Sequence, residues 1–546
     1  MDSANPIEGG RMVTVRTRHA PEKAPDDLST ESETVVTATD DQITAAADIL
    51  DLRREDIDPG ALASISEDVA RQYQAIPVRF DGDVLLVAVV EPGDKIRQHL
   101  ARVAGRNIRL VAASLSDIIW AIDSNYQAIS NVEALVKIFE SVEGARRLAV
   151  GASTAEQLDG DEPIVQAVDS ILTQAVRDRA SDVHIVPASE YVRVRFRTDG
   201  VLKDIIQLPM AMGAGVISRI KVLASMNIVE RRRPQDGQLT ITIDDREVDV
   251  RVATVATVMG ENCVLRLLDK NRAVLRLNDL GMPSDTHAAY SEIVKSPFGM
   301  VLVAGPTGSG KTTTLYATLS EVSTTAVNVM TIEDPVEYVN PMMYQIQTNE
   351  QAGLTFATGL KSILRHDPDV ILVGEIRDVE TTRIAVQSAM TGHLVVSSVH
   401  ATDAVSALHR FLDMGIESFL VASSVLAIVG QRLVRRICPS CKTTYTPTDA
   451  EMVFYREGGG SEKEVFYQGA GCNFCSDTGY KDRIGIYELL IMTPEIRRLV
   501  VGWATQEELR NMAVKQGMRT MRQEAVNLVG QDITTIAEVI RSVYTL

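Results

Sequence analysis

Gly305-Pro306-Thr307-Gly308-Ser309-Gly310-Lys311-Thr312-Thr313 lies between an apolar run, 300–304, and a helix-like run, 314–319. This order predicts a strand, a glycine-rich turn and a helix, and the spacing G-x-x-x-x-G-K-T is that of a P-loop. Glycines let successive backbone N–H groups point into one concavity, and the helix N-terminus adds partial positive charge, so both suit phosphate oxygens. Lys311 is expected to reach the outer phosphates, and the Thr312 hydroxyl to bind Mg²⁺. The stretch predicts a nucleoside triphosphate site; the alternative is a glycine-rich turn without a ligand.

Three further apolar runs of this region end in the polar residues Glu333, Glu375 and His400. Strands that alternate with helices predict a doubly wound parallel sheet, whose ligands bind beyond the carboxyl ends of the strands. We therefore expect the three side chains to converge on the phosphate site. The alternatives are an acid that caps the next helix and a histidine that is structural.

The charges of these residues suggest a role for each. Glu375 follows a buried strand and is predicted to orient or deprotonate the attacking water. Glu333 is placed to hold Mg²⁺ through water or to support that nucleophile, and His400 to contact the γ-phosphate. The strand before Glu375 lacks the Asp of an ordinary Walker B motif, so Mg²⁺ is expected to depend mainly on Thr312.

Arginines alternate with apolar residues in the strands upstream of the P-loop. The run 192–197 places three arginines on one face of a strand, and Arg251 and Arg266 lie in later strands. A strand arginine is most often part of a surface ion pair. The functional alternative is that some reach the phosphates of a nucleotide held by another subunit, as arginine fingers do.

Four of the five cysteines form two C-x-x-C pairs, Cys438 with Cys441 and Cys472 with Cys475. Four thiolates at this spacing suit tetrahedral Zn²⁺ in a structural site with no open position for catalysis. Four reduced cysteines without a metal are the alternative. The fifth, Cys263, is expected to be simply buried in a strand.

Composition narrows the class of protein. The chain has 546 residues, a net charge of −18 and a pI near 5.0, which argues against a general nucleic-acid binder because phosphate neutralisation needs excess Lys and Arg. The N-terminus shows no basic start followed by an apolar core, and no apolar run approaches the ~20 residues that span a bilayer. We expect a soluble, cytoplasmic protein whose membrane role comes through partners.

Composition and periodicity also suggest how the chain is divided. The predicted parts are a disordered tail (1–40), an N-terminal docking module (41–126), a linker that carries one helix (127–160), a second N-terminal α+β domain (161–275), a P-loop domain (286–436), a tetracysteine zinc subdomain (437–492) and a helical C-terminal domain (493–546).

Together these motifs resemble those of the secretion ATPases, the motors of type II secretion and type IV pilus assembly. The resemblance covers nearly everything from about residue 41 onward. Its motifs are the Walker A stretch 305–313, an Asp box at 331–338, a variant Walker B at 364–378, a His box at 391–404, and N-terminal signatures at 180–184 and 232–237. The two cysteine pairs match the family's zinc subdomain.

The resemblance implies an α/β multidomain fold: a RecA-like P-loop domain preceded by an α+β (PAS-like) domain and a small α+β module. It implies a homo-hexamer that uses ATP, Mg²⁺ and Zn²⁺, with Arg251 and Arg266 acting across the subunit boundary and Glu333, Glu375 and His400 at the site. The implied partners are an inner-membrane platform protein and a cytoplasmic recruiting protein, at the inner face of the cytoplasmic membrane. Ala253 and Ala256 depart from the family's usual Ser and Pro.

A zinc-containing, nucleic-acid-stimulated motor on the same P-loop core is the competing interpretation. The acidic balance of the chain speaks against it.

Overall fold

The computed structural model describes residues 50–52, 55, 57–126, 132, 134–141, 162–244, 246–269 and 276–543. The predicted disordered tail and most of the predicted linker lie outside these residues. Within the linker, residues 134–141 are helical, as predicted. Three bodies are described below, each by itself.

The N-terminal body, residues 57–126, is a small α+β unit. A tight turn at 82–83 joins β1 to β2 as an antiparallel hairpin, and β3 extends the sheet parallel to β2, which confirms the predicted hairpin. Its elements are α1 (Pro59–Leu62), α2 (Glu67–Gln72), β1 (Ala75–Asp81), β2 (Val84–Val89), α3 (Asp94–Ala104), β3 (Asn107–Ala112) and α4 (Leu115–Asn125).

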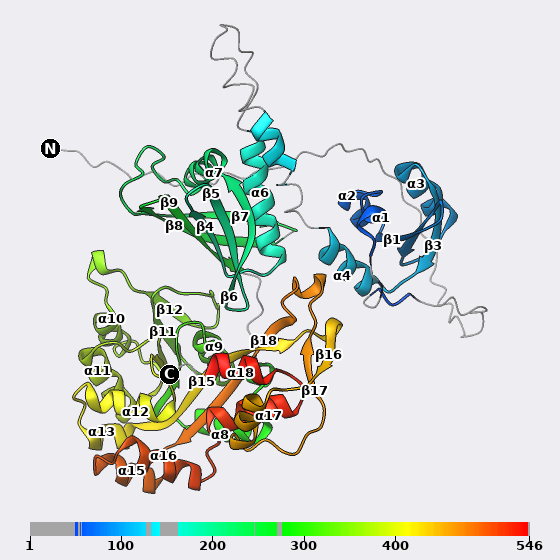
Figure 1. Cartoon of the computed structure of the whole chain (residues 1–546). Coiled ribbons are helices and arrows are strands. Elements are labelled where there is room, and N and C mark those ends of the chain that lie inside the picture. The colour runs from blue at the N-terminus through cyan, green and yellow to red at the C-terminus, as the bar shows by residue number, and fades with distance from the viewer. Residues whose placement is uncertain are drawn as a thin grey trace, which may run out of the picture. The chain divides into compact units, whose positions relative to one another are not determined.

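The antiparallel-sheet body, residues 162–269, is built on six strands in the order β6-β5-β4-β9-β8-β7. Two helices, α6 (Glu162–Arg177) and α7 (Met210–Leu223), supply the apolar partners for one face of this sheet (Figure 1). Alternation along each strand sends apolar side chains to that face and polar ones to the other. The strands are β4 (Asp182–Pro187), β5 (Tyr191–Thr198), β6 (Val201–Pro209), β7 (Gln235–Ile243), β8 (Arg246–Thr257) and β9 (Gly260–Asp269).

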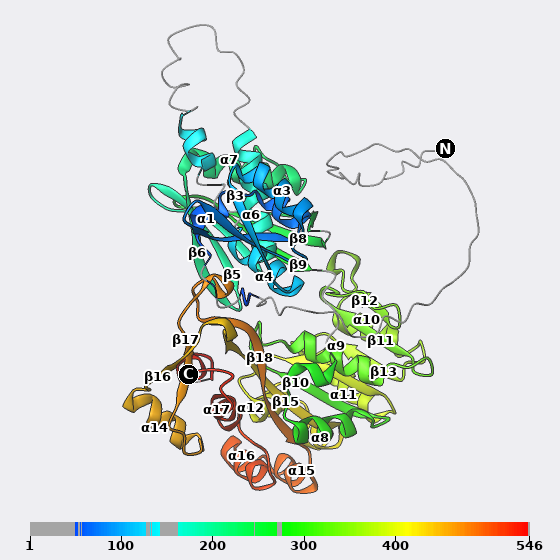
Figure 2. The same cartoon turned by 90° about the vertical axis from the view of Figure 1, so that its right-hand side faces the viewer.

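The P-loop body, residues 276–543, contains a seven-stranded sheet in the order β12-β11-β13-β14-β10-β15-β18. Every pair is parallel except β15 with β18. Helices cover both faces of the sheet (Figure 2), so this is the predicted doubly wound arrangement. The strands are β10 (Gly299–Ala304), β11 (Val329–Glu333), β12 (Tyr344–Gln347), β13 (Val370–Val373), β14 (Leu394–Val399), β15 (Val425–Ile437) and β18 (Tyr480–Ile491).

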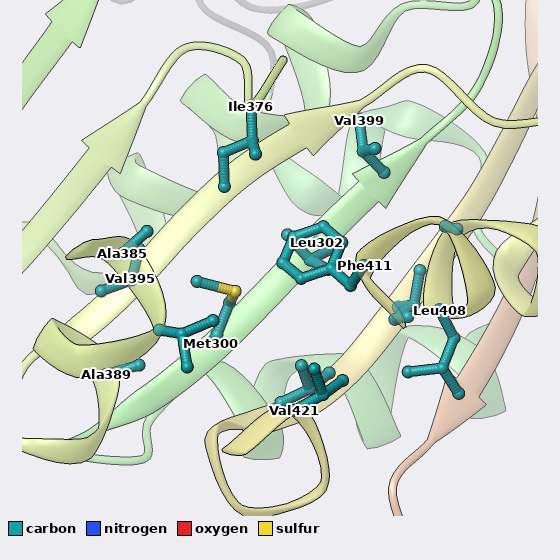
Figure 3. Close-up of a cluster of buried hydrophobic side chains, with 14 of the residues drawn as sticks. Met300, Leu302, Ile376, Ala385, Ala389, Val395, Val399, Leu408, Phe411 and Val421 are labelled. Carbon is teal, nitrogen blue, oxygen red and sulfur yellow. The ribbon is translucent and has the colours of Figure 1, made fainter. Parts of the chain in front are cut away.

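Two apolar cores hold this sheet, one on each face. Met300 and Leu302 of β10 point to one core, which α11, α12 and α13 cover (Figure 3). Val301 and Val303 point to the other core, which α8 and α9 cover. A strand buried on both faces must be apolar throughout, which explains the unbroken run 300–304. The helices are α8 (Ser284–Val294), α9 (Lys311–Val322), α10 (Phe356–Ile363), α11 (Val379–Met390), α12 (Ala404–Asp413) and α13 (Ser418–Ser424).

The tetracysteine segment is an insertion between two paired strands. β15 ends at Ile437, just before Cys438, and the chain returns as β18, which pairs with β15 in the main sheet. Thus residues 480–491, which the sequence analysis groups with the zinc subdomain, complete the seven-stranded sheet instead. The inserted elements are β16 (Lys442–Tyr445), α14 (Asp449–Glu457) and β17 (Phe466–Gly469).

The predicted helical C-terminal region consists of two pairs with different partners. The first pair packs on the core of the main sheet, and the second packs on Phe454, Tyr455 and Phe466 of the insertion. The helices are α15 (Pro494–Val501), α16 (Gln506–Lys515), α17 (Met521–Gly530) and α18 (Ile536–Val543). Among all described helices, none is both long and apolar enough to cross a bilayer.

The core packing can be tested at Phe411 on α12, whose side chain is fully buried against Met300 and Leu302 (Figure 3). Phe411→Ala leaves a cavity between helix and sheet, and we expect it to cost about 3–5 kcal/mol of stability. A lower midpoint of urea unfolding, followed by circular dichroism, would show this. Phe411→Leu keeps most of the volume and should shift the midpoint much less; equal midpoints for all three proteins would contradict the packing.

Candidate active site

The P-loop connects β10 to α9, and its glycines permit its tight path. Gly310, at the N-terminus of α9, has φ +86°, a left-handed conformation that favours glycine. The loop lies over β15, where the carbonyl of Gln431 would be only 2.5 Å from a Cβ on Gly305. The side chain of Gln431 accepts a hydrogen bond from Thr314 Oγ1 at 2.8 Å, so β15 supports the first turn of α9 from below.

Lys311 is folded over the loop in this structure. Its Nζ donates to the carbonyls of Gly305 and Pro306, each at 3.0 Å. Burial lowers the pKa of Lys311, and the negative charge of Glu375 opposes that shift. An ammonium in this position can exchange the two carbonyls for phosphate oxygens without moving far. The Thr312 side chain beside it is exposed, as a metal-binding hydroxyl must be.

The strand order brings the predicted polar residues together. β11, β13, β14 and β10 are consecutive neighbours in the sheet, and Glu333, Glu375, His400 and the P-loop follow their carboxyl ends. Since all four strands are parallel, these ends share one edge of the sheet. The four strand ends therefore lie along the edge where the sequence analysis expects a phosphate site.

Glu375 is the carboxylate most directly engaged with other groups of the site. Its Oε2 lies 3.2 Å from His400 Nε2, and its Oε1 forms an ion pair with Arg377. The Glu375 side chain is only 15% exposed, whereas those of His400 and Arg377 are 39% and 64% exposed. A carboxylate held from two sides at the mouth of the site has the geometry of a group that orients or deprotonates a water.

Glu333 is buried more deeply and has different partners. Its Oε2 accepts from the hydroxyl of Tyr316 at 2.7 Å, and its Oε1 accepts from Thr331 Oγ1 at 2.6 Å. Burial and the bond to Glu333 both raise the pKa of Tyr316. Because Tyr316 belongs to α9, Glu333 ties the end of β11 to the helix that the P-loop begins. This arrangement favours support of the site over direct contact with the metal.

The absence of a Walker B Asp has a steric reason. A Cβ on Gly374 would lie 3.3 Å from both Glu333 Cα and Ile332 O, which is tighter than most Cβ contacts in proteins. The ends of β13 and β11 approach each other so closely that a side chain here would require the backbone of β11 to shift by a few tenths of an ångström. Glu375 thus becomes the first residue after β13 that can present a carboxylate.

The predicted arginines lie on the polar face of the antiparallel-sheet body. Arg195 Nε pairs with Asp204 at 2.6 Å, as expected for a surface ion pair. Arg251 and Arg266 are directly opposite each other on β8 and β9, which makes a local concentration of positive charge.

The four paired cysteines come together as the spacing predicts. Their sulfur atoms all lie within 4.8 Å of one another, and Cys438 and Cys472 are 3.9 Å apart at Sγ. A tetrahedral ion with metal–sulfur bonds of about 2.3 Å needs sulfurs about 3.8 Å apart, so the donor set fits one. Backbone N–H groups of Gly471 and Gly479 donate to two of the sulfurs, which favours thiolates. Cys263 is buried apart from them, as predicted.

Sequence reasoning missed the partners of the site carboxylates. Arg377 is two residues beyond Glu375, a spacing that offered a signal, but Tyr316 and Gln431 carry no recognisable motif. Their contacts depend on which strands become neighbours.

Comparisons with known proteins agree with this geometry. A family model described as "Type II/IV secretion system protein" matches residues 157–541, and one described as "MshEN domain" matches residues 43–131. The type II secretion system protein HxcR of Pseudomonas aeruginosa is 42% identical over 463 residues, covering 84% of this chain and 94% of the relative. The type IV pilus assembly ATPase PilB of Myxococcus xanthus is 38% identical over 499 residues, covering 90% and 88%.

A solved structure supports the fold. The Legionella pneumophila ATPase DotB aligns with a TM-score of 0.51 at 21% identity, covering 68% of this chain and 93% of that one. With a family model over most of the chain and relatives this similar over most of their own length, the chain belongs to the type II/IV secretion system protein family, that of the secretion ATPases which its motifs resemble.

Proposed function

We propose that this protein is a hexameric ATPase motor that drives assembly of a type IV pilus or a type II secretion pseudopilus through an inner-membrane platform protein. Family membership supports the motor class, since relatives of this chain are named for both systems. The observation that carries the catalytic part is Glu375. Its carboxylate stands beside the P-loop, within reach of the charge of Lys311, and His400 and Arg377 hold it in place.

In the proposed reaction, the backbone amides of the P-loop and Lys311 bind the phosphates of ATP. Mg²⁺, held through the Thr312 hydroxyl, would neutralise phosphate charge when bound. Glu375 accepts a proton from the attacking water, or orients it, while His400 fixes Oε2 of that carboxylate and contacts the γ-phosphate. Glu333 keeps α9 and β11 in register through Tyr316 and so supports the phosphate loop.

Arg251 and Arg266 complete the site from another subunit. Two guanidinium groups on a rigid sheet can stabilise the charge that develops on the transferred phosphoryl group. A ring is then required for activity, because the arginines of each chain act at the P-loop of a neighbouring chain and not at their own. ATP turnover would rotate the second N-terminal domain (161–275) against the P-loop domain (286–436), and the platform protein would receive that motion.

The remaining parts serve attachment and integrity. The N-terminal module (41–126) is a docking module for a cytoplasmic recruiting protein, which would keep the motor at the inner face of the cytoplasmic membrane. Zn²⁺ bound by Cys438, Cys441, Cys472 and Cys475 would close an insertion that has little apolar core of its own. Four cysteine ligands would fill all four coordination positions of the ion, which supports a structural zinc site over a catalytic one.

The role of Glu375 is tested by Glu375→Gln, which keeps the shape and removes the base. We expect ATP hydrolysis to fall by about 10²–10⁴-fold, with ATP binding retained in a fluorescent-nucleotide assay. Glu380→Gln on α11 is the matched control: Lys361 is its only ion-pair partner among the described residues, and both are exposed. This variant should hydrolyse ATP normally. Unchanged hydrolysis in Glu375→Gln would refute the assignment.

The arrangement in trans is tested by mixing variants. Chains carrying Arg266→Ala lack the arginine but keep the P-loop, and chains carrying Lys311→Ala do the reverse. We expect each alone to keep only a small, measurable residual activity, and the mixed oligomer, purified through one tag on each chain, to regain activity. Mixed oligomers as inactive as the parents would place the arginine and the P-loop of one site in the same chain. The same mixture with Arg251→Ala tests the second arginine.

The zinc site is tested by metal analysis of the purified protein. We expect about one zinc ion per chain, lost in Cys441→Ser together with thermal stability of the insertion. Cys263→Ala is the control, because Cys263 lies in β9 away from the cluster, and it should keep its zinc. A wild-type protein without bound metal would refute the assignment.

A further inference from the structure

A row of charged residues crosses the polar face of the antiparallel sheet. Asp182 on β4 is the direct partner of Arg266 on β9, which is the direct partner of Arg251 on β8. Gln238 on β7 continues the row beside Arg251. These four side chains line one cavity of about 580 Å³. The row therefore places two guanidinium groups and the Asp182 carboxylate in a single concave surface, which Asp236 of β7 also lines.

Asp182 holds Arg266 by one particular edge. Its Oδ1 accepts from the Nε of Arg266 at 3.0 Å. Among the described residues, no hydrogen bond engages either terminal nitrogen of Arg266, and its side chain is 63% exposed. The guanidinium is thus fixed at its inner edge, while the two terminal nitrogens, the ones that bind phosphate in a fork, remain free.

The carboxylate itself is firmly placed. The Asp182 side chain is only 10% exposed, and its Oδ2 accepts from the hydroxyl of Ser181 at 2.8 Å. Arg197 Nε approaches the same Oδ2 at 3.6 Å from the strand on the other side. A buried carboxylate with partners on three sides cannot follow a mobile arginine outward, so the arginine is the partner that is oriented.

Repulsion explains why such a support is needed. Like charges directly opposite on neighbouring strands destabilise each other, and Arg251 and Arg266 are in that relation. Arg251 has no ion pair with any described residue, so it has no comparable anchor. Without Asp182, the side chain of Arg266 would be free to turn away from Arg251 into solvent.

We propose that Asp182 is a positioning residue, which holds Arg266 by its Nε so that its terminal nitrogens are presented to the phosphates of a nucleotide bound to the P-loop of another subunit. This rests on the proposed role of Arg266 in trans. Asp182 never touches the nucleotide. It acts only through the guanidinium of Arg266. The negative charge of Asp182 lowers the net positive charge of this surface, and Arg251, which has no ion pair with a described residue, restores it.

The test is a double-mutant cycle in the full-length chain, with Asp182→Asn as the shape-conserving variant and Asp182→Ala beside it. We expect kcat for ATP hydrolysis to fall by about 10- to 100-fold while the KM for ATP stays near the wild-type value, since the chain's own P-loop is intact. Adding Asp182→Ala to Arg266→Ala should cost nothing more, whereas adding it to Arg251→Ala should lower kcat further. A loss of the same factor in both backgrounds, or no loss in either single variant, would overturn the proposal.

Two controls separate positioning from folding. Asp204→Ala breaks the ion pair with Arg195 on the same face of the sheet and should leave kcat unchanged. A lowered kcat in this variant would overturn the specific role of Asp182, because any lost ion pair would then suffice. Asp182→Asn should unfold at the wild-type temperature by circular dichroism; a fall in that temperature that accounts for the lost activity would equally overturn it.

Mixed oligomers separate this proposal from the function on which it rests. Chains with Asp182→Ala, mixed with Lys311→Ala chains, should regain activity as Arg266→Ala chains do, because intact arginine surfaces then face intact P-loops. If the Arg266→Ala mixture regains activity and the Asp182→Ala mixture does not, the positioning role fails alone. If neither mixture regains activity, the action in trans fails and the positioning role fails with it.

Discussion

The parallel pairing of β10 with β14 on one side and β15 on the other is the constraint on which the P-loop body depends. β10 is buried on both faces, so it must be apolar and central, and its position determines where the P-loop emerges. Parallel strands in turn require crossovers through helices, which cover both faces and leave the carboxyl ends of the strands as one polar edge. The P-loop, Glu375 and His400 lie at the same edge because each follows the carboxyl end of one of these parallel strands.

The energetic cost of burying a charged group is the second constraint, and the two carboxylates Glu333 and Glu375 differ in how deeply they are buried. Glu333 is buried and accepts hydrogen bonds from Thr331 and Tyr316, and the bond from Tyr316 joins β11 to α9. Glu375 remains nearer to solvent, with His400 and Arg377 as partners that are themselves partly exposed. A carboxylate that must exchange a proton with water needs such accessible partners, because fully buried hydrogen bonds would be costly to break. The two acids look alike in sequence, and their surroundings separate them.

The antiparallel sheet solves a different problem on its polar face. It sets two arginines opposite each other, which is unfavourable unless anions compensate. Asp182 compensates one of them from within, through a hydrogen bond to Nε that leaves the terminal nitrogens of Arg266 without a hydrogen bond to any described residue. The arrangement suits a surface that is completed by a ligand from outside, and it is consistent with an active site assembled from two subunits.

Sequence reasoning reached the P-loop, the doubly wound sheet, the polar strand ends and the four clustered cysteines. Each depends on local patterning: glycine spacing, apolar runs with polar ends, and paired thiols. It did not reach the return of β18 into the main sheet or the division of the C-terminal helices between two cores, since these depend on which distant surfaces pack together.

The sequence by itself determined which chemical groups are present and in what local geometry. Backbone sterics and side-chain alternation act over a few residues, so Gly310, the run 300–304 and the Cys-x-x-Cys pairs can be interpreted without a fold. Only the tertiary structure decided which carboxylate is buried, which arginine has an anchor and how closely the backbone of β11 approaches Gly374. Those properties arise from strands far apart in the chain, whose distances of 3 Å or so are set by packing.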